Sequence, residues 1–308
     1  MRHKATGLQA PVSFTVERLK RSLEEKESNS QMNLPHPVMR SDLLERYLNL
    51  LGVQRRKPST DALGELVHAQ LVKVPFENIS KLYYKKHLNH QGLPNLEFFL
   101  DGIEHFHFGG TCYTNNYYFY QLLANLGYQI KLCGADMANP DVHLVSMVTV
   151  EQREYLVDVG YAAPFLTPLP CDLTTDYVIV LGRDKYVLKP QDAQGCSQME
   201  LYRDGSLKHS YLVNPVPRRI QEFDHIIVDS YQEDSTFMNA ILLARFFPNR
   251  SLVLHNLTVI ESQGTLSRSQ ILTSRDELVQ AAYEYFAIPK EFTMDIVEDI
   301  GQFGHAWN

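Results

Sequence analysis

The first regular pattern of apolar residues along the chain has the spacing of helices. Apolar side chains recur every three or four positions in residues 43–51, which predicts a helix with Ser41 as its N-cap. A second run with the same spacing covers residues 63–71 and stops before Pro75, which cannot continue a helix. A third predicted helix covers residues 111–126. The first third of the chain is therefore expected to be helical.

After this helical region the period changes to that of strands. Residues 142–150 and 155–159 are short valine-rich runs, and the polar segment between them predicts a hairpin. Further strand-like runs follow, with turn-forming glycines between them: 177–181, 186–188, 199–202 and 211–213. This succession predicts an antiparallel sheet or a small barrel.

The last part of the chain is mixed. Residues 237–247 fit a helix or an apolar strand, residues 252–260 predict one strand, and residues 275–286 predict a helix that ends before Pro289. Helices, then strands, then a mixed segment indicate an α+β fold rather than alternating βαβ units.

Residues 1–40 are predicted to be a flexible extension. The segments Ser28-Asn29-Ser30-Gln31 and Pro35-His36-Pro37 are rich in residues that break regular structure. Residues 14–23 fit either one short amphipathic helix or a solvated tail, and their polar composition favours the tail.

Composition narrows the function classes. The 308 residues carry a formal net charge of -7, which argues against a nucleic-acid partner. The four cysteines are far apart and lack the spacing of a zinc site or a disulfide framework, which favours a reducing compartment and no metal. The sequence has no apolar run near the ~20 residues that cross a bilayer and no signal-peptide core. We therefore expect a cytoplasmic protein without a membrane partner.

The segment Gly109-Gly110-Thr111-Cys112 leads directly into the third predicted helix. The glycines permit a tight turn, and Thr111 can cap the helix, which places Cys112 in its first turn. Free N–H groups and the helix dipole at that position favour a thiolate, the nucleophilic form of cysteine. The alternative is a buried structural cysteine.

A histidine and an aspartate lie where the predicted hairpin can bring them together. If Glu151-Gln152 forms a two-residue turn, Asp158 lies opposite Val145 and is a diagonal neighbour of His143, within roughly 7–8 Å on the same face. A carboxylate in an apolar strand needs a partner, and the histidine supplies one. Together with Cys112 the pair predicts a nucleophilic triad, although a His–Asp pair that only bridges two strands is the alternative.

These motifs resemble those of the arylamine N-acetyltransferase family. The resemblance covers residues 41–170 most clearly, and it rests on these residues: Val74-Pro75-Phe76-Glu77-Asn78, Gly109-Gly110-Thr111-Cys112, Asn116, His143-Leu144-Val145 and Leu156-Val157-Asp158-Val159-Gly160-Tyr161.

The resemblance implies a three-part fold with a cysteine-protease-like catalytic core. Its parts are an N-terminal helical bundle in residues 41–130, an antiparallel β-barrel in residues 131–230 and a C-terminal α/β lid in residues 231–308. The implied substrate-binding residues are Phe76, Gly110, Gly160 and Tyr161. The implied supporting residues are Glu77 and Asn116.

The resemblance also implies a ping-pong reaction of xenobiotic metabolism. Acetyl-CoA, or another short acyl-CoA, acylates Cys112, and an arylamine, hydrazine or hydroxylamine then takes the acyl group. His143 is implied as general base and acid, and Asp158 as the residue that orients it. The implied partners are a small-molecule amine and an acyl-CoA, and the chain is expected to be a monomer or homodimer.

The sequence departs from the family pattern at Phe108, where an arginine usually stands. Because that arginine pairs with the glutamate of the motif, Glu77 needs another partner here, such as backbone N–H groups or a nearby histidine. Two alternatives stay open. One is a Cys-His-Asp amidase, peptidase or transglutaminase-like enzyme, and the other is a catalytically weakened binding protein on the same scaffold.

Overall fold

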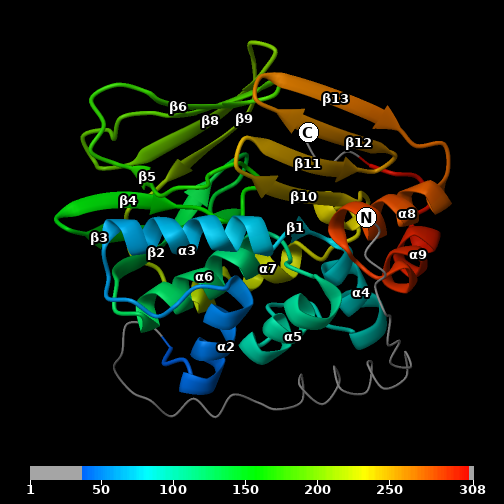
Figure 1. Ribbon diagram of the computed structural model, residues 1–308, viewed down its shortest axis with the longest axis horizontal. Helices are drawn as coiled ribbons and strands as arrows, with labels where there is room; N and C mark the ends of the chain where they lie inside the picture. Colours follow the sequence, from blue (N-terminus) through cyan, green and yellow to red (C-terminus); the bar gives the residue numbers. More distant parts are fainter. Residues whose placement is uncertain (1–36, 305–308) are drawn as a thin grey trace, which may run out of the picture.

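The computed structural model describes residues 37–304, in which helices occupy one side of the molecule and two antiparallel sheets the other (Figure 1). Most of the predicted extension, residues 1–40, lies outside the described residues. None of the described helices is long and apolar enough to cross a membrane.

The helical part contains the three predicted helices and two more. α2 begins at Ser41 with Arg40 at the N-cap position and no side-chain cap, so the predicted capping role of Ser41 is wrong. Two helices between α3 and α6 were not predicted: the apolar spacing of α4 is irregular, whereas α5 has a clear apolar face that was overlooked. The helices are α2 (Ser41–Leu51), α3 (Thr60–Lys73), α4 (Ile79–Leu88), α5 (Leu96–Phe106) and α6 (Cys112–Asn125).

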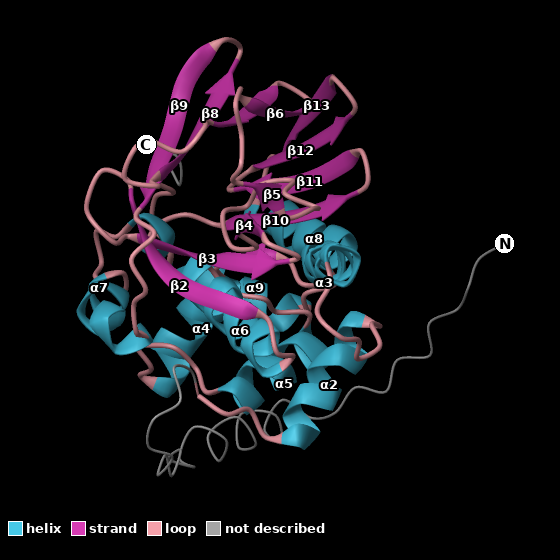
Figure 2. Cartoon of the chain, turned by 90° about the vertical axis from the view of Figure 1, so that its left-hand side faces the viewer, coloured by secondary structure: helices cyan, strands magenta, loops and turns pink. Residues whose placement is uncertain are grey.

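An eight-stranded antiparallel sheet follows, in the order β5-β4-β3-β2-β9-β8-β7-β6. Its edge strands β5 and β6 do not pair with each other, so the sheet is curled and open rather than the closed barrel that we predicted (Figure 2). The strands are β2 (Gln129–Asp136), β3 (His143–Val150), β4 (Arg153–Val157), β5 (Leu169–Pro170), β6 (Tyr177–Leu181), β7 (Asp184–Leu188), β8 (Ser197–Arg203) and β9 (Ser206–Val213). α6 packs on β3 and β2, which places the start of α6 near the start of β3.

A five-stranded sheet forms the C-terminal part, in the order β1-β10-β11-β12-β13. Its first strand comes from the helical region, because β1 pairs with β10. The strands are β1 (Phe76–Glu77), β10 (Leu242–Phe247), β11 (Arg250–His255), β12 (Thr258–Gln263) and β13 (Leu266–Ile271). The ambiguous segment 237–247 thus ends in a strand, and the single strand predicted for residues 252–260 is wrong, since a turn at Asn256 divides it into β11 and β12.

Short helices complete the chain on either side of this sheet. α8 packs on β10 and β11, and α9 packs between α8 and α4 (Figure 1). These elements are the 3₁₀ helices η1 (Ile220–Phe223) and η2 (Thr236–Met238), and the α-helices α7 (Asp224–Asp229), α8 (Arg275–Phe286) and α9 (Lys290–Asp299). One apolar core joins the helices to the curled sheet, and a second lies between α4, the five-stranded sheet, α8 and α9.

Candidate active site

A tight glycine turn places Cys112 at the start of α6. Gly109 has no room for a side chain, because a Cβ atom there would lie 1.9 Å from the carbonyl oxygen of Pro75. Gly110 has a φ of 99°, which glycine adopts without strain. Cys112 therefore sits in the first helical turn, beside the free N–H groups and the positive end of the helix dipole. Thr111 occupies the N-cap position, but its hydroxyl does not cap the helix as predicted.

Glu77 is fully buried, and its carboxylate holds the glycine turn. Oε1 accepts hydrogen bonds from the N–H groups of Gly109 (3.1 Å) and Gly110 (2.8 Å), and Oε2 accepts one from the N–H of Ser80 (2.9 Å). The Ser80 hydroxyl donates to the same carboxylate. Burial raises the pKa of Glu77, although these donors oppose the rise. Backbone N–H groups and a serine, rather than a histidine, thus replace the missing arginine.

Phe108 is buried in an aromatic cluster and needs no charged partner. Its ring centroid lies 6.1 Å from that of Tyr84, 5.5 Å from that of Phe106 and 5.2 Å from that of Phe292. Because Phe292 belongs to α9, the cluster joins the helical part to the C-terminal part. The apolar surroundings explain why a phenylalanine fits at this position.

The hairpin of β3 and β4 brings His143 and Asp158 into contact, as predicted. Glu151 and Gln152 both have positive φ and form a two-residue turn, which sets Ser146 opposite Val157. This register places Asp158 beside the start of β3. Nε2 of His143 lies 2.8 Å from Oδ2 of Asp158, and both side chains are almost completely buried.

Asp158 accepts further hydrogen bonds that fix its carboxylate. Oδ1 accepts from the Asn116 amide (2.9 Å) and from the N–H of Gly160 (3.0 Å), and Oδ2 accepts from the Tyr211 hydroxyl (2.9 Å). The prediction missed Tyr211, which lies on β9, because no local motif marks it. A carboxylate with donors on both oxygens is held in one orientation and stays ionised.

The environment of His143 favours its charged form. Burial alone would lower its pKa, but the charge and hydrogen bond of Asp158 and the neighbouring Cys112 sulfur raise the pKa to about 10. Burial likewise disfavours the Asp158 carboxylate, yet His143, Asn116 and the Gly160 N–H outweigh it and lower the pKa of Asp158. At neutral pH the pair is therefore an imidazolium and a carboxylate.

Asn116 and Gly160 let helix α6 approach the hairpin closely. The Asn116 amide donates to the carbonyl of Leu144 (2.7 Å) and accepts from the N–H of Val159 (2.8 Å). A Cβ atom on Gly160 would lie 2.8 Å from the Cα atom of Cys112. Glycine is required there because a larger residue would push Cys112 away from the hairpin.

The predicted substrate-binding residues occupy different places around this centre. Gly110 borders a pocket beside the glycine turn, described below. The Tyr161 ring lies 5.7 Å from that of His143 and lines a second pocket, of about 670 Å³, between the two sheets. Phe76 lies on β1, where its ring packs 5.6 Å from that of Phe237. Gly160 touches Cys112 and Asn116 as described.

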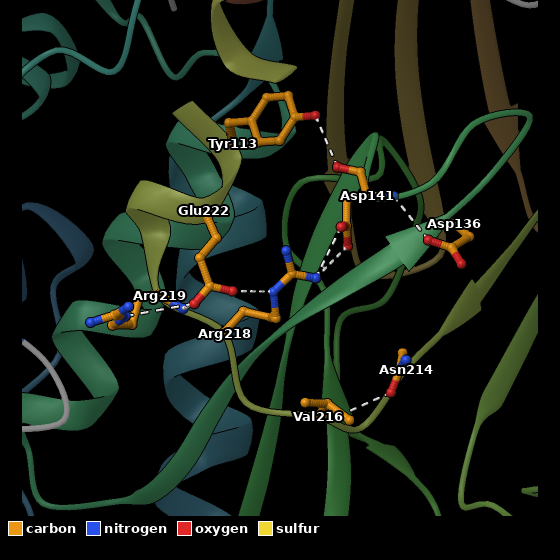
Figure 3. Close-up of polar contacts among 8 residues, drawn as sticks. All are labelled: Tyr113, Asp136, Asp141, Asn214, Val216, Arg218, Arg219 and Glu222. Carbon is orange, nitrogen blue, oxygen red and sulfur yellow. Dashed lines mark hydrogen bonds and ion pairs between the residues drawn. The ribbon is translucent and has the colours of Figure 1, made fainter. Parts of the chain in front are cut away.

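The loop before His143 is held by an arginine from the segment after β9 (Figure 3). Nη1 of Arg218 lies 3.0 and 2.9 Å from the two carboxylate oxygens of Asp141, and its Nε donates to Glu222. The Tyr113 hydroxyl contacts the carbonyl of Asp141 at 3.3 Å. The network therefore ties together the residue after Cys112 and a residue just before His143.

Within residues 37–304 no group of three His, Cys, Asp or Glu side chains is placed to hold a metal ion. Cys112, Cys133 and Cys171 are buried and Cys196 is half-buried, and of these four only Cys112 lies at the start of a helix.

Comparison with known proteins identifies the family. A family model described as N-acetyltransferase matches residues 59–294. Arylamine N-acetyltransferase 2 of Mus musculus is 27% identical over 210 residues, which cover 59% of this chain and 69% of the relative. Arylamine N-acetyltransferase 2 of Rattus norvegicus is 24% identical over 212 residues, covering 59% and 70%.

Solved structures have the same fold. The arylamine N-acetyltransferase of Mycobacterium marinum in complex with CoA superposes with a TM-score of 0.70 at 19% identity, covering 83% of this chain and 99% of that chain. The enzyme of Nocardia farcinica gives a TM-score of 0.67 at 25% identity, with 82% and 92% covered. With most of its length matched by the family model, the chain belongs to the arylamine N-acetyltransferase family of acyl-CoA-dependent acyltransferases.

Proposed function

We propose that the protein moves an acetyl or other short acyl group from CoA, through a thioester on Cys112, to the nitrogen of an arylamine, hydrazine or hydroxylamine. The observation that carries this proposal is the junction of Cys112, His143 and Asp158. The Cys112 sulfur is near enough to the His143 imidazole to raise its pKa, and Nε2 of that imidazole faces a fixed carboxylate.

In the first half-reaction the Cys112 thiolate attacks the carbonyl carbon of the acyl-CoA thioester. A new carbon–sulfur bond forms, the bond to the CoA sulfur breaks, and the CoA sulfur leaves with a proton from His143. Asp158 stabilises the imidazolium before this transfer and keeps Nε2 in place. The His143 pKa then falls, because the Cys112 thiolate that helped to raise it is consumed.

In the second half-reaction the amine nitrogen attacks the carbonyl of the Cys112 thioester. Neutral His143 accepts the proton that the nitrogen loses, the bond to the Cys112 sulfur breaks, and the thiolate returns beside the imidazolium. The same three side chains therefore serve both steps, and acyl-CoA acts as a substrate.

The experiment is intact-protein mass spectrometry after mixing with acetyl-CoA. We expect a mass increase of one acetyl group in the wild type and in Cys196→Ala, the matched control at the most accessible of the other cysteines. Cys112→Ala should gain nothing. Absence of acetyl-enzyme in the wild type would overturn the proposal.

The second step separates transfer from hydrolysis. Isolated acetyl-enzyme should discharge faster with aniline or hydrazine than with water, and the acetylated amine should appear in equal amount. Discharge at the same rate with and without amine would instead indicate an amidase that shares the triad.

A further inference from the structure

Lys81 is a buried lysine that the proposed chemistry does not use. It lies in the first turn of α4 and is only 6% exposed. It lines an open pocket, with about 470 Å³ of empty space when the adjoining solvent is included, that also touches Gly110, Thr111 and Tyr113. Since Thr111 and Tyr113 flank Cys112 in sequence, this Lys81 pocket lies against the nucleophile's turn.

The hydrogen bonds of the Lys81 ammonium are with neutral groups. Nζ donates to the carbonyl and the hydroxyl of Ser230, each at 2.7 Å, and lies 4.3 Å from the ring centroid of Tyr231. Within residues 37–304 no carboxylate forms an ion pair with it. A buried ammonium without a carboxylate is unusual, because burial removes its hydration, and here only the charge of the nearby Cys112 sulfur opposes that loss.

The lack of a carboxylate partner also affects proton binding at Lys81. Burial lowers the pKa of Lys81 to about 8, against the opposing effect of the Cys112 sulfur. An anion bound in the pocket would stabilise the ammonium and reverse this fall.

The walls of the pocket define what kind of anion fits. Of the Lys, Arg, His, Asp and Glu side chains that the structure describes, Lys81 is the only one among the lining residues. Aromatic rings of Tyr84, Phe99 and Tyr231 form much of the rest. The positive end of the α6 dipole adds to the lysine charge. One cation among rings matches one carboxylate on a small, flat or short apolar group better than a multiply charged phosphate chain.

We propose that the Lys81 pocket binds a carboxylate carried by a reactant at Cys112. Two reactants can supply it: a dicarboxylic acyl group on CoA, through its distal carboxylate, or an aromatic amine acceptor with a ring carboxylate. The proposal rests on the proposed function, because the reactant must reach the acyl-carrying cysteine. It makes Lys81 a specificity-determining residue.

The variant that tests this is Lys81→Met, which keeps the length of the side chain and removes its charge. Lys85→Met is a matched control. Lys85 lies one turn further along α4 and donates to the neighbouring carbonyl of Tyr231 at 2.6 Å, but it does not line the pocket. A purely structural role for the lysine bonds to this segment would affect both variants alike.

The kinetic readout is a ratio of kcat/KM values. The acceptor arm compares 4-aminobenzoate with aniline, using acetyl-CoA, and the donor arm compares succinyl-CoA with acetyl-CoA, using aniline. In one arm, Lys81→Met should lower the ratio of kcat/KM for the carboxylate-bearing substrate to kcat/KM for the neutral substrate by about tenfold or more. The arm that changes identifies which reactant carries the carboxylate. Lys85→Met should leave both ratios unchanged. Unchanged ratios in Lys81→Met would overturn the proposal.

Two further measurements separate this inference from other outcomes. One such outcome is that Lys81→Met raises KM for acetyl-CoA but not for an acetyl thioester that lacks the nucleotide. In that case the lysine binds the CoA phosphates, and the proposal is wrong. Calorimetric titration of the unacylated protein with 4-aminobenzoate and with succinate tests binding without turnover. Binding that Lys81→Met abolishes supports the pocket even if no acetyl-enzyme forms, in which case only the proposed function fails. Equal binding by the wild type and Lys81→Met counts against the pocket.

Discussion

The Tyr211 hydroxyl donates a hydrogen bond of 2.9 Å to the same oxygen of Asp158 that faces Nε2 of His143 at 2.8 Å. The tyrosine ring also lies 5.2 Å from the imidazole. Tyr211 therefore fixes the carboxylate from the side opposite Asn116, whose amide binds the other oxygen. Its role is to position Asp158 rather than to touch the reacting atoms.

Replacement of Tyr211 by phenylalanine removes this donor and keeps the ring. Because a hydrogen bond to a charged group contributes about 1.5–3 kcal/mol, we expect kcat/KM for acetyl transfer to fall roughly tenfold or more, with the fold retained. Tyr202→Phe is the control, since its hydroxyl binds Glu200 away from the triad. Equal kinetics for the two variants would show that Asp158 does not depend on Tyr211.

The His143–Asp158 pair also predicts how stability depends on pH. The folded pKa of His143, about 10, lies above its unfolded value of about 6.5, so its contribution is complete below the unfolded value and is lost as pH rises toward 10. The folded pKa of Asp158 is lowered, so its contribution is present above about pH 4 and is lost as pH falls through the folded value. Wild-type stability should be highest between these limits.

Asp158→Asn tests this dependence by urea unfolding at about pH 6 and about pH 9. The wild type should lose more unfolding free energy between the two pH values than the variant, in which burial keeps His143 neutral. Turnover should fall roughly a thousandfold or more, because the imidazole loses its orientation. Asp172→Asn, at an exposed pair with Arg153, should behave like the wild type. Identical pH profiles for Asp158→Asn and the wild type would contradict the ion pair.

The part of the site that the sequence predicts is the part made by local structure. The period of the strands and a two-residue turn determine that His143 and Asp158 meet, and a glycine turn before a helix determines where Cys112 lies. Tyr211 was missed because it is 53 positions from Asp158 and reaches it through the pairing of β2 with β9, which no local pattern specifies.

Closure of the sheet and the surroundings of Lys81 were unpredictable for related reasons. A barrel and an open curled sheet have the same alternation of residues, and only the absence of pairing between β5 and β6 distinguishes them.

Residues 252–260 look like one strand because apolar Leu257 lies in the turn at Asn256. α4 lacks a clear apolar stripe, since α9 and the segment at Ser230 cover different sides of it.

Cysteine alkylation should distinguish Cys112 from the other cysteines. Burial raises the pKa of Cys133 and of Cys171 to about 12, and burial with nearby Asp192 raises that of Cys196. Iodoacetamide at neutral pH should therefore modify Cys112 first, as peptide mass spectrometry would show. His143→Gln should slow this reaction about tenfold, because the imidazolium that holds the thiolate is gone. Faster modification of Cys196 than of Cys112 would argue against the nucleophile assignment.

Phe108→Arg, which restores the family residue, should destabilise this protein rather than improve it. Both oxygens of Glu77 already accept hydrogen bonds, and the aromatic cluster around Phe108 offers a guanidinium no carboxylate. Burial of such a charge should lower the free energy of unfolding by roughly 3 kcal/mol or more. Phe108→Leu, which removes only ring contacts, should cost less. The measurement is urea unfolding together with acetyl-enzyme formation, and a gain in both with arginine would contradict this account.

Arg218→Gln should weaken catalysis from outside the triad. Its guanidinium bridges Asp141, two residues before His143, and Glu222 before α7 (Figure 3). Asp141 has a φ of 56°, a backbone conformation that non-glycine residues rarely adopt. The ion pair between its carboxylate and Arg218 helps to hold the loop in this conformation. Loss of the bridge should lower kcat severalfold while Cys112 alkylation continues. Arg219→Gln is the control, because that side chain is 82% exposed and contacts only Glu222 in the described residues. If the two variants have the same kcat, the bridge does not position His143.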